Sequence, residues 1–447
     1  MTRLLFLTGP GGAGTTTLAA ATALRAAGSG HRTLLLGVAD AGELAAVLGA
    51  SGVSGDGNVL DIDDALDDAL DDDFDDLKDS GAAADSAAAD SEDIEVTASS
   101  EDTRNAGNAD DSGEPSAANA SAVRRTALAN LTVRRFDPAA ATETALVDLA
   151  KLLTGPLAAA GLTAPDATEL GPVPGLPDIL ALREIASAVG SSEWDTVVVD
   201  GPPLKAALAM LAWPETAAAA LRRVRPIEGQ AARALRPLLA GLVGLPTPFA
   251  MVTQWTDNAA AEIAAVRASL VHPGSVVRIV GSPAAAVQPL LQATPTLLAL
   301  HGLRADADTL ADVPRQDAEP LGVAALEALG EAVYAGGDPG PGLADPPEPV
   351  MLSEGEGYRY DLPLPGVERD QLGLVRSGDE LVVSVEVPGV AAQRRAFPLP
   401  GALRRCRIAS ARISDGVLRV GFKPDESLWP ERFLADHSDE DTQNGDR

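Results

Sequence analysis

Short apolar runs alternate with Ala- and Leu-rich stretches over about the first forty residues of the chain. Arg3–Thr8 is an almost continuous apolar run, Thr15–Ala27 has the composition of a helix that ends near Gly28, and Thr33–Val38 is a second apolar run. A strand, a helix and a strand in so short a segment predict a right-handed βαβ unit in a parallel sheet.

The alternation resumes near residue 124 and continues to about residue 335. Strands are predicted at Leu131–Phe136, at the run that ends in Asp200, at Phe249–Thr253 and at Ser275–Val280. Asp137 and Pro138 form a good helix start for the stretch that reaches Leu162, and Asp178–Val189 is a second helix. We expect an α/β domain made of residues 1–52 and 124–335.

The pattern changes after a Gly- and Pro-rich linker at residues 336–349. Short apolar strands separated by turn residues are predicted at Tyr358–Leu364, Leu372–Val375, Glu380–Val387, Gln393–Phe397, Arg407–Ile413 and Val417–Phe422. Antiparallel strands of this length predict a small β-sandwich over residues 350–425, followed by an acidic tail at 426–447.

Residues 53–123 interrupt the α/β domain with a segment rich in Asp, Ala, Ser and Gly. Such a composition buries too little apolar surface to offset chain entropy, so this acidic insert is expected to be disordered. Within it, Asp61–Leu77 carries a helical apolar stripe among its aspartates. Two interpretations stay open: a solvated spacer with a transient helix, or an acidic amphipathic motif that docks on a basic partner.

Composition narrows the class of protein. The formal net charge of -31 disfavours nucleic-acid partners, because no dense basic patch opposes it. The single cysteine, Cys406, excludes an internal disulfide and fits a reducing compartment. No apolar run is long enough for an integral membrane segment, and the first apolar run is too short for a signal peptide. The chain is therefore expected to be cytoplasmic.

A glycine-rich loop separates the first predicted strand from the first predicted helix. It comprises Gly9, Pro10, Gly11, Gly12, Ala13 and Gly14, followed by Thr15, Thr16 and Thr17. In this order a strand, a loop and a helix present backbone N–H groups and a helix N-terminus to an anion, which predicts phosphate binding. The lysine that normally precedes the Mg²⁺-binding Ser or Thr is replaced by Thr15.

Two carboxylates follow predicted strands of the same sheet. Asp40 comes just after Thr33–Val38, and Asp200 ends a valine-rich run. Ligands of doubly wound sheets collect at the carboxyl ends of strands, so Gly14, Asp40 and Asp200 are expected around one crevice. A strand-ending Asp taken alone is often only a helix cap, but the three features together favour a nucleotide site.

These residues resemble the ArsA and tail-anchored-protein-targeting ATPases. Gly9–Thr17 matches their deviant phosphate loop, Gly-Lys-Gly-Gly-Val-Gly-Lys-Thr-Thr, and Asp40 and Asp200 begin the counterparts of two further motifs. The resemblance covers roughly residues 1–335 and implies an α/β P-loop NTPase fold, a parallel sheet with flanking helices. It also implies that Gly9–Thr17 hold ATP, that Thr16 and Asp200 hold Mg²⁺, and that Asp40 activates water.

The C-terminal region resembles the alpha-crystallin domain of small heat-shock proteins. The similar segments are Leu362–Val367, Phe397–Pro400 and Ala411–Val420. Some bacterial ArsA-like ATPases carry such a module at the C-terminus, so this resemblance agrees with the first. The alternative is an unrelated immunoglobulin-like sandwich.

The loop departs from the family at both of its lysines. One contacts phosphates within the subunit and the other reaches across a dimer; Thr15 and Pro10 stand in their places. A cation at 4 Å from a phosphate charge contributes on the order of 4 kcal/mol at an effective dielectric constant of about 20, so weak or absent hydrolysis is expected. Lys205, in a segment that approaches the terminal phosphate in the family, either compensates or is an exposed lysine without such a role.

Three functions follow from the resemblance. The first is a degenerate ATP site coupled to the binding of a client or partner protein. The second is an active ArsA-type ATPase in ion transport or protein targeting, with a compensating cation. The third is a non-catalytic subunit that pairs with an intact ATPase paralogue. The expected partners are accordingly a second subunit, in a homodimer or heterodimer, and a protein client.

Overall fold

A computed structural model gives the structure of the protein. It describes residues 2–38, 41–49, 52–53, 60–61, 128–159, 161–163, 165–166, 169, 173–239, 248–281, 284–306, 318–340, 348–355, 357–387 and 391–425. Asp40, nearly all of the predicted acidic insert 53–123 and the predicted tail 426–447 lie outside these residues.

Six parallel strands form the central sheet, in the order β5-β2-β6-β1-β7-β8. Their bounds are β1 Arg3–Thr8, β2 Thr33–Gly37, β5 Leu131–Arg135, β6 Thr196–Asp200, β7 Ser275–Ile279 and β8 Ala305–Asp306. A separate two-stranded ladder joins β3 (Gly52–Val53) to β4 (Leu60–Asp61). β1 lies between β6 and β7, and Leu7 is paired in register with Asp200. The phosphate loop therefore leaves the sheet beside the end of the strand that carries Asp200.

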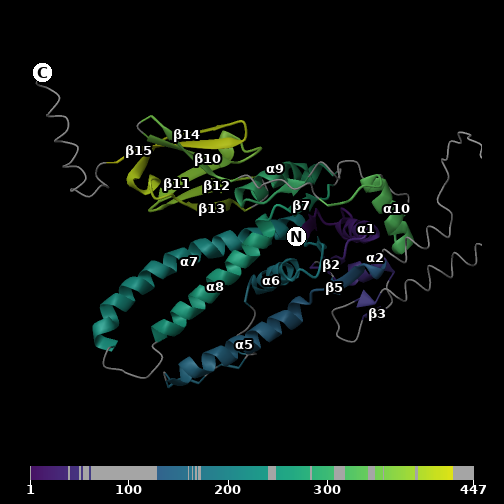
Figure 1. Ribbon diagram of the computed structural model, residues 1–447, viewed down its shortest axis with the longest axis horizontal. Helices are drawn as coiled ribbons and strands as arrows, with labels where there is room; N and C mark the ends of the chain where they lie inside the picture. The colour runs from purple at the N-terminus through teal and green to yellow at the C-terminus, as the bar shows by residue number, and fades with distance from the viewer. Residues whose placement is uncertain are drawn as a thin grey trace, which may run out of the picture.

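Helices cover both faces of the sheet, as the alternation of side chains in β1 requires. Leu5 and Leu7 pack in the cluster that includes α1 (Thr15–Gly28), α2 (Ala41–Leu48) and α10 (Val323–Tyr334). Leu4 and Phe6 pack in the cluster on the opposite face. That face is covered by α6 (Leu176–Gly190), α7 (Leu204–Leu239), α8 (Pro248–Val271) and α9 (Gln288–Leu300). Figure 1 shows α7 and α8 extending well beyond the sheet, with α5 (Pro138–Ala159) on the same side.

The prediction of a strand at Phe249–Thr253 is wrong, because this segment is part of helix α8. Pro248 is the first residue of that helix, a position that proline favours, and the Ala-rich sequence that follows propagates it. A short apolar run does not distinguish a strand from a buried helical segment by periodicity alone. By contrast, β5 and the start of α5 agree with prediction: the Asp137 carboxylate accepts hydrogen bonds from the Ala139 and Ala140 amides at 2.9 and 3.0 Å.

The C-terminal region is a β-sandwich of two antiparallel sheets, β14-β15-β10-β9 and β11-β12-β13. The strands are β9 Val350–Glu354, β10 Gly357–Pro363, β11 Leu372–Ser377, β12 Glu380–Val385, β13 Gln393–Pro398, β14 Cys406–Ser414 and β15 Val417–Pro424. Among the described residues the sandwich also contains the short 3-10 helices η3 Arg369–Gln371 and η4 Leu403–Arg405, whereas η2 Ala285–Val287 precedes α9 in the α/β domain. The six predicted strands are present. The edge strand β9 was not predicted, because all five of its residues are exposed and give no alternation.

The sandwich packs directly on the helices of the α/β domain. In Figure 1 it lies along α7 and α9, with β13 nearest to them, and its buried residues belong to the same apolar cluster as that face of the sheet. The Arg395 guanidinium pairs with Glu215 of α7 at 3.2 Å and donates to the Leu300 carbonyl oxygen at 2.8 Å. The Thr296 hydroxyl donates to the Pro365 carbonyl oxygen. These contacts fix the sandwich to the helices.

Candidate functional site

The phosphate loop runs from the end of β1 to the start of α1. Gly12 and Gly14 have φ values of 75° and 80°, in the left-handed region that favours glycine. The Ala13 amide donates to the Pro10 carbonyl oxygen at 3.0 Å and closes the turn. Gly14 is the N-cap of α1 and supplies no capping side chain. The amides of the first helical turn are therefore available to an anion.

The loop is held against the neighbouring strand ends. The Leu204 amide, at the start of α7, donates to the Gly9 carbonyl oxygen at 2.8 Å. The Thr8 hydroxyl donates to the Pro202 carbonyl oxygen at 2.8 Å. Gly9 itself has no room for a side chain, because a Cβ there would lie 2.7 Å from the Val280 carbonyl oxygen. The sequence thus builds a fixed cradle rather than a free loop.

A cavity of about 490 Å³ lies over this cradle. It is lined by Gly9, Pro10, Gly11, Gly12, Gly14, Thr15, Thr16, Thr17, Glu43, Ala46, Val47, Gly201, Pro203, Glu319 and Leu321. Among these described lining residues there is no lysine or arginine, and the two charged ones, Glu43 and Glu319, are acidic. The backbone of the cavity is therefore that of a phosphate-binding site, but its charged side chains are negative where such a site normally has positive ones.

Asp200 is a buried carboxylate beside the cavity: its neighbour Gly201 lines the cavity, whereas Asp200 itself is not among the lining residues. It ends β6, is 1% exposed, and neither carboxylate oxygen has a hydrogen-bond partner. Burial raises the pKa of Asp200 to about 7; a hydrogen-bonding influence of the Thr16 hydroxyl opposes this, and the charge of Glu43 adds to it. Thr16 is thus close enough to act on the carboxylate, although its hydroxyl does not make a hydrogen bond of normal geometry. An oxygen pair left unsatisfied in the interior is a costly arrangement that a bound cation would relieve.

The structure brings most of the predicted site residues together. The four glycines of the loop line one cavity together with the three threonines that begin α1, whereas Ala13 does not line it. Ala13 instead packs against the core beneath the loop. Lys205 is exposed at the first turn of α7 and is not among the residues that line the cavity. Asp40 lies outside the described residues, so its predicted role stays a prediction.

Glu43 and Glu319 are the site residues that sequence reasoning did not assign. Glu43 lies in α2, three positions after Asp40, and faces the cavity. Glu319 precedes α10, and the neighbouring Gly322 amide donates to the Val47 carbonyl oxygen at 2.9 Å. That contact brings a late segment of the chain over an early one. Because Glu43 lies so close to Asp40 in the sequence, it could have been considered as a site residue, whereas no local sequence signal points to Glu319.

A second cavity, of about 400 Å³, lies between α6, α7 and α8. Its lining is mainly apolar and comprises Ile179, Arg183, Trp213, Ala217, Ala220, Leu221, Ala259, Glu262, Ile263 and Val266. Arg183 and Glu262 form an ion pair of 3.4 Å across its rim. We call this the helical groove; a lining of this kind suits an apolar ligand better than a charged one.

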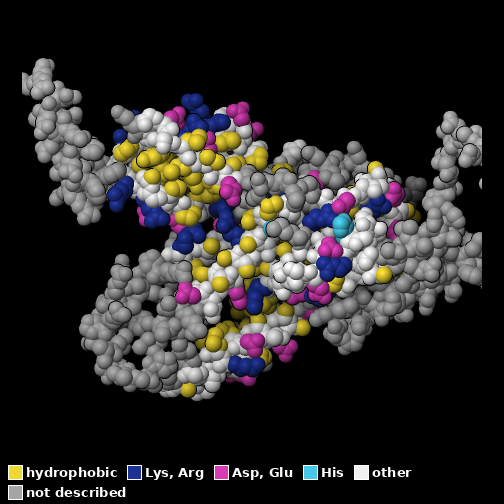
Figure 2. All heavy atoms as spheres, viewed as in Figure 1, with side chains coloured by type: hydrophobic (Ala, Val, Ile, Leu, Met, Phe, Trp, Pro, Cys, Tyr) yellow, Lys and Arg dark blue, Asp and Glu magenta, His cyan; other side chains and the backbone are white. Residues whose placement is uncertain are grey.

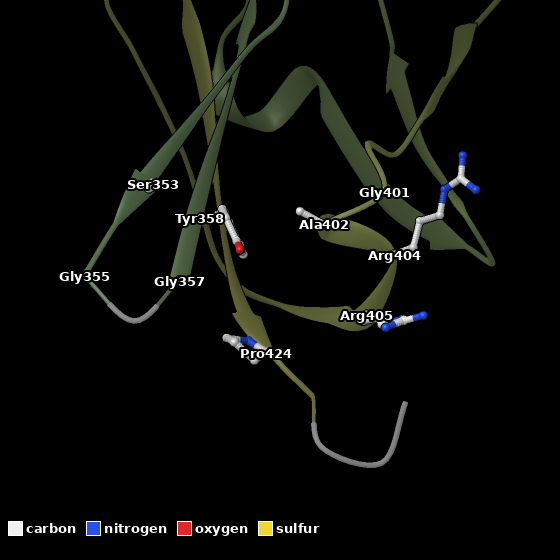
Figure 3. A pocket seen from close by; sticks show the side chains of 9 residues that line it. All are labelled: Ser353, Gly355, Gly357, Tyr358, Gly401, Ala402, Arg404, Arg405 and Pro424. Carbon is white, nitrogen blue, oxygen red and sulfur yellow. The ribbon is translucent and has the colours of Figure 1, made fainter. Parts of the chain in front are cut away.

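The β-sandwich has a cavity of about 590 Å³ at one end, between the β9–β10 hairpin and η4. Figure 3 shows Tyr358 directed into it, whereas the side chains of Arg404 and Arg405 point away from Tyr358. The Arg404 Nε atom instead donates to the Leu399 carbonyl oxygen at 3.0 Å. Figure 2 shows hydrophobic side chains gathered over the face of the sandwich, with lysine and arginine at its margins. The most exposed large apolar residues here are Val350, Met351, Leu352 and Val375.

Within the part of the chain that the structure describes, no group of three or more His, Cys, Asp or Glu residues is arranged to hold a metal ion. Cys406 is buried and forms no disulfide. None of the described helices has the length and apolar character needed to span a membrane.

Comparison with known proteins agrees with both domains. The family described as anion-transporting ATPase matches residues 2–59 and 107–290, which together are more than half of the chain. The HSP20-like domain found in ArsA matches residues 355–422.

Individual relatives extend this similarity. The chain is 33% identical to the uncharacterized protein SCO2128 of Streptomyces coelicolor over 462 aligned positions, covering 96% of this chain and 99% of that one. It is 28% identical to protein Rv2184c of Mycobacterium tuberculosis, covering 59% of this chain and 71% of that one. Among solved structures, HSP18.5 from E. histolytica is 22% identical over 19% of this chain and 93% of its own, with a TM-score of 0.15.

Proposed function

Because the chain belongs to the anion-transporting ATPase family, we propose that it keeps a nucleotide pocket, hydrolyses ATP weakly or not at all, and acts by binding a partner or client protein. The observation that carries this proposal is the charge of the cavity over the phosphate loop. Its described lining has two glutamates and no lysine or arginine. ATP hydrolysis depends on cations that neutralise the transferred phosphate, and such a cation is worth a factor of about 10³ or more in rate.

Magnesium fits the residues that remain. Thr16 and Asp200 supply a hydroxyl and a carboxylate, the oxygen donors that Mg²⁺ prefers, and both oxygens of Asp200 are unpartnered. Bound Mg²⁺ neutralises phosphate charge. In the proposal Thr16 and Asp200 hold the ion, the backbone of Gly9–Thr17 orients the phosphates, and Asp40 positions water. In this proposal the arrangement still binds the nucleotide, but it lacks the positive side chains that would speed hydrolysis.

An active ATPase that uses Lys205 is the first alternative. Lys205 follows Leu204, whose amide is bonded to the Gly9 carbonyl oxygen at 2.8 Å. Its side chain is exposed and outside the cavity lining. It would therefore have to change conformation to meet a phosphate in the cavity. A second subunit, in a homodimer or in a heterodimer with an intact paralogue, is the other source of a cation.

The helical groove supports the part of the proposal that concerns a client. Trp213, Leu221 and Ile263 give it an apolar floor, and the alanines around them leave room for a bulky side chain. An apolar or amphipathic helix is the ligand that suits such a groove. In a variant that keeps Trp213 and replaces Trp194, Trp255 and Trp429 by phenylalanine, tryptophan fluorescence should shift to shorter wavelength when an amphipathic Leu/Lys model peptide binds. An Ala220→Glu variant should lose that shift, whereas Lys151→Gln, on an exposed part of α5, should retain it.

Calorimetry with Mg²⁺ and ATP, followed by steady-state hydrolysis, tests the main proposal. We expect measurable binding and turnover close to the background rate. Thr15→Lys should raise the turnover, because it restores a cation at the first helical turn. The absence of any binding at millimolar ATP would contradict the retained pocket, and robust turnover by the unmodified chain would contradict the missing catalytic charge.

A further inference from the structure

We infer that this pocket accepts a nucleoside triphosphate only as its Mg²⁺ complex, so that the divalent ion controls occupancy of the site and not turnover alone. The inference rests on the proposed nucleotide site and specifies its ligand. It follows from three features of the described residues: the negative side-chain charge in the cavity, the lack of hydrogen-bond partners for the Asp200 carboxylate oxygens, and the residue at position 15.

The cavity repels free phosphate. Glu43 and Glu319 are the charged residues among its described lining, and Glu43 is close enough for its charge to act on Asp200. The attraction comes from backbone amides and the N-terminus of α1, equivalent to about half an elementary charge. A metal-free triphosphate carries about four negative charges near neutral pH, so the carboxylates oppose it at short range.

Position 15 explains why this pocket differs from an ordinary phosphate loop. A lysine there reaches the β- and γ-phosphates and neutralises charge whether or not metal is bound. In this chain Thr15 is partly buried over the loop, with its Oγ1 atom only 2.9 Å from where a Cβ of Gly9 would lie. A hydroxyl in this place donates one hydrogen bond and brings no charge. Among the described residues that line the cavity, no side chain therefore brings a positive charge that would attract phosphate without metal, and the weak attraction of the backbone amides remains.

The buried carboxylate supplies the reason for metal. Asp200 is 1% exposed, its two oxygens have no hydrogen-bond partner of normal geometry, and the Thr16 hydroxyl, which lines the cavity, is close enough to lower its pKa. A divalent ion between Thr16 and the phosphates would satisfy this carboxylate and halve the charge of the nucleotide. Because the same ion produces both effects, its removal should weaken nucleotide binding through both.

Calorimetric titration of ATP into the full chain, in Mg²⁺ and in EDTA, tests the inference. We expect the dissociation constant to rise at least about 100-fold in EDTA, since the loss of two unit charges near the phosphates amounts to several kcal/mol at an effective dielectric constant of about 20. Thr15→Lys should restore binding in EDTA and reduce the ratio at least about tenfold. Ser29→Lys adds the same charge at the other end of α1, about 20 Å away, and should leave the ratio unchanged.

Two further variants test the acidic groups separately. Glu319→Gln should improve binding in EDTA more than in Mg²⁺, because it removes repulsion that the ion otherwise screens. Asp200→Asn should weaken binding in Mg²⁺ and leave the EDTA value little changed, with circular dichroism verifying the fold. Equal affinities in Mg²⁺ and EDTA for the unmodified chain would overturn the inference and leave the proposed nucleotide site standing. No binding in either buffer would overturn the proposed site itself.

Discussion

Glu215 of α7 and Arg395 of β13 form an ion pair of 3.2 Å in which each side chain is only 9% exposed. Arg267 of α8 shares the same carboxylate, and the Arg395 guanidinium also lies 4.5 Å from the centre of the Phe397 ring. The pair joins the sandwich to the helix that starts beside the phosphate loop. The two domains are therefore joined by desolvated charge as well as by apolar contact.

We predict that Glu215→Gln destabilises the protein by about 3–5 kcal/mol, because it leaves Arg395 buried without its carboxylate. Urea unfolding followed by circular dichroism measures the change. Lys151→Gln removes a pair whose side chains are 71% and 68% exposed, and it should cost less than about 1 kcal/mol. Similar losses for the two variants would contradict a buried junction.

His301 should make the stability depend on pH. Burial, helped by the charge of Arg395, lowers its pKa from 6.5 to about 4. Below pH 6.5 the unfolded chain therefore binds a proton at this histidine, whereas the folded chain stays unprotonated until the pH nears 4. The free energy of unfolding consequently decreases as the pH falls from 6.5 toward 4. We expect His301→Gln to remove about 3 kcal/mol of this loss. Unfolding free energies of both proteins at pH 7.5 and pH 4.5 measure it, and parallel pH profiles would contradict the assignment.

Asp200→Asn should stabilise the metal-free protein. The folded pKa of about 7 lies above the ordinary value of 3.8, so Asp200 destabilises the folded protein progressively as the pH rises from about 3.8 to about 7, and by a constant amount above that. An amide avoids this cost, and we expect a gain of about 2–4 kcal/mol at pH 8 with a smaller difference at pH 5. Thermal unfolding in EDTA tests this. A variant less stable than the parent at pH 8 would show that the carboxylate has partners in the fold.

Gly9 and Gly11 differ in what a methyl group would meet. A Cβ at Gly9 would lie 2.7 Å from the Val280 carbonyl oxygen, whereas a Cβ at Gly11 would have nothing within 4 Å. We predict that Gly9→Ala destabilises the protein by about 1–3 kcal/mol through overpacking, and that Gly11→Ala stays within about 0.5 kcal/mol of the parent. Chemical denaturation of the two variants measures the difference. Equal stabilities would show that the loop is not pressed against β7.

Most of the fold was predictable because its signals are local. The apolar runs of β1, β2 and β6 and the glycines after β1 specify a strand, a loop and a helix without reference to distant residues. The strand predicted at Phe249–Thr253 failed because helix and strand compete within a short apolar run, and the helix that Pro248 begins prevails.

The site was predictable only in part. The loop and Asp200 follow from local sequence, but Glu319 reaches the cavity through contact between distant segments, here Gly322 with Val47. The pairing of Arg395 with Glu215 is equally non-local. Such contacts depend on how finished elements pack, and no spacing along one chain encodes them.

The steady-state rate of ATP hydrolysis by the purified full chain, in Mg²⁺ and beside an Asp40→Asn variant, tests the central claim most directly. A pocket with Glu43 and Glu319 in its wall, and with Thr15 and Pro10 in place of the loop lysines, predicts a rate near background that Asp40→Asn does not lower. Robust turnover by the parent chain that Asp40→Asn abolishes would contradict the account.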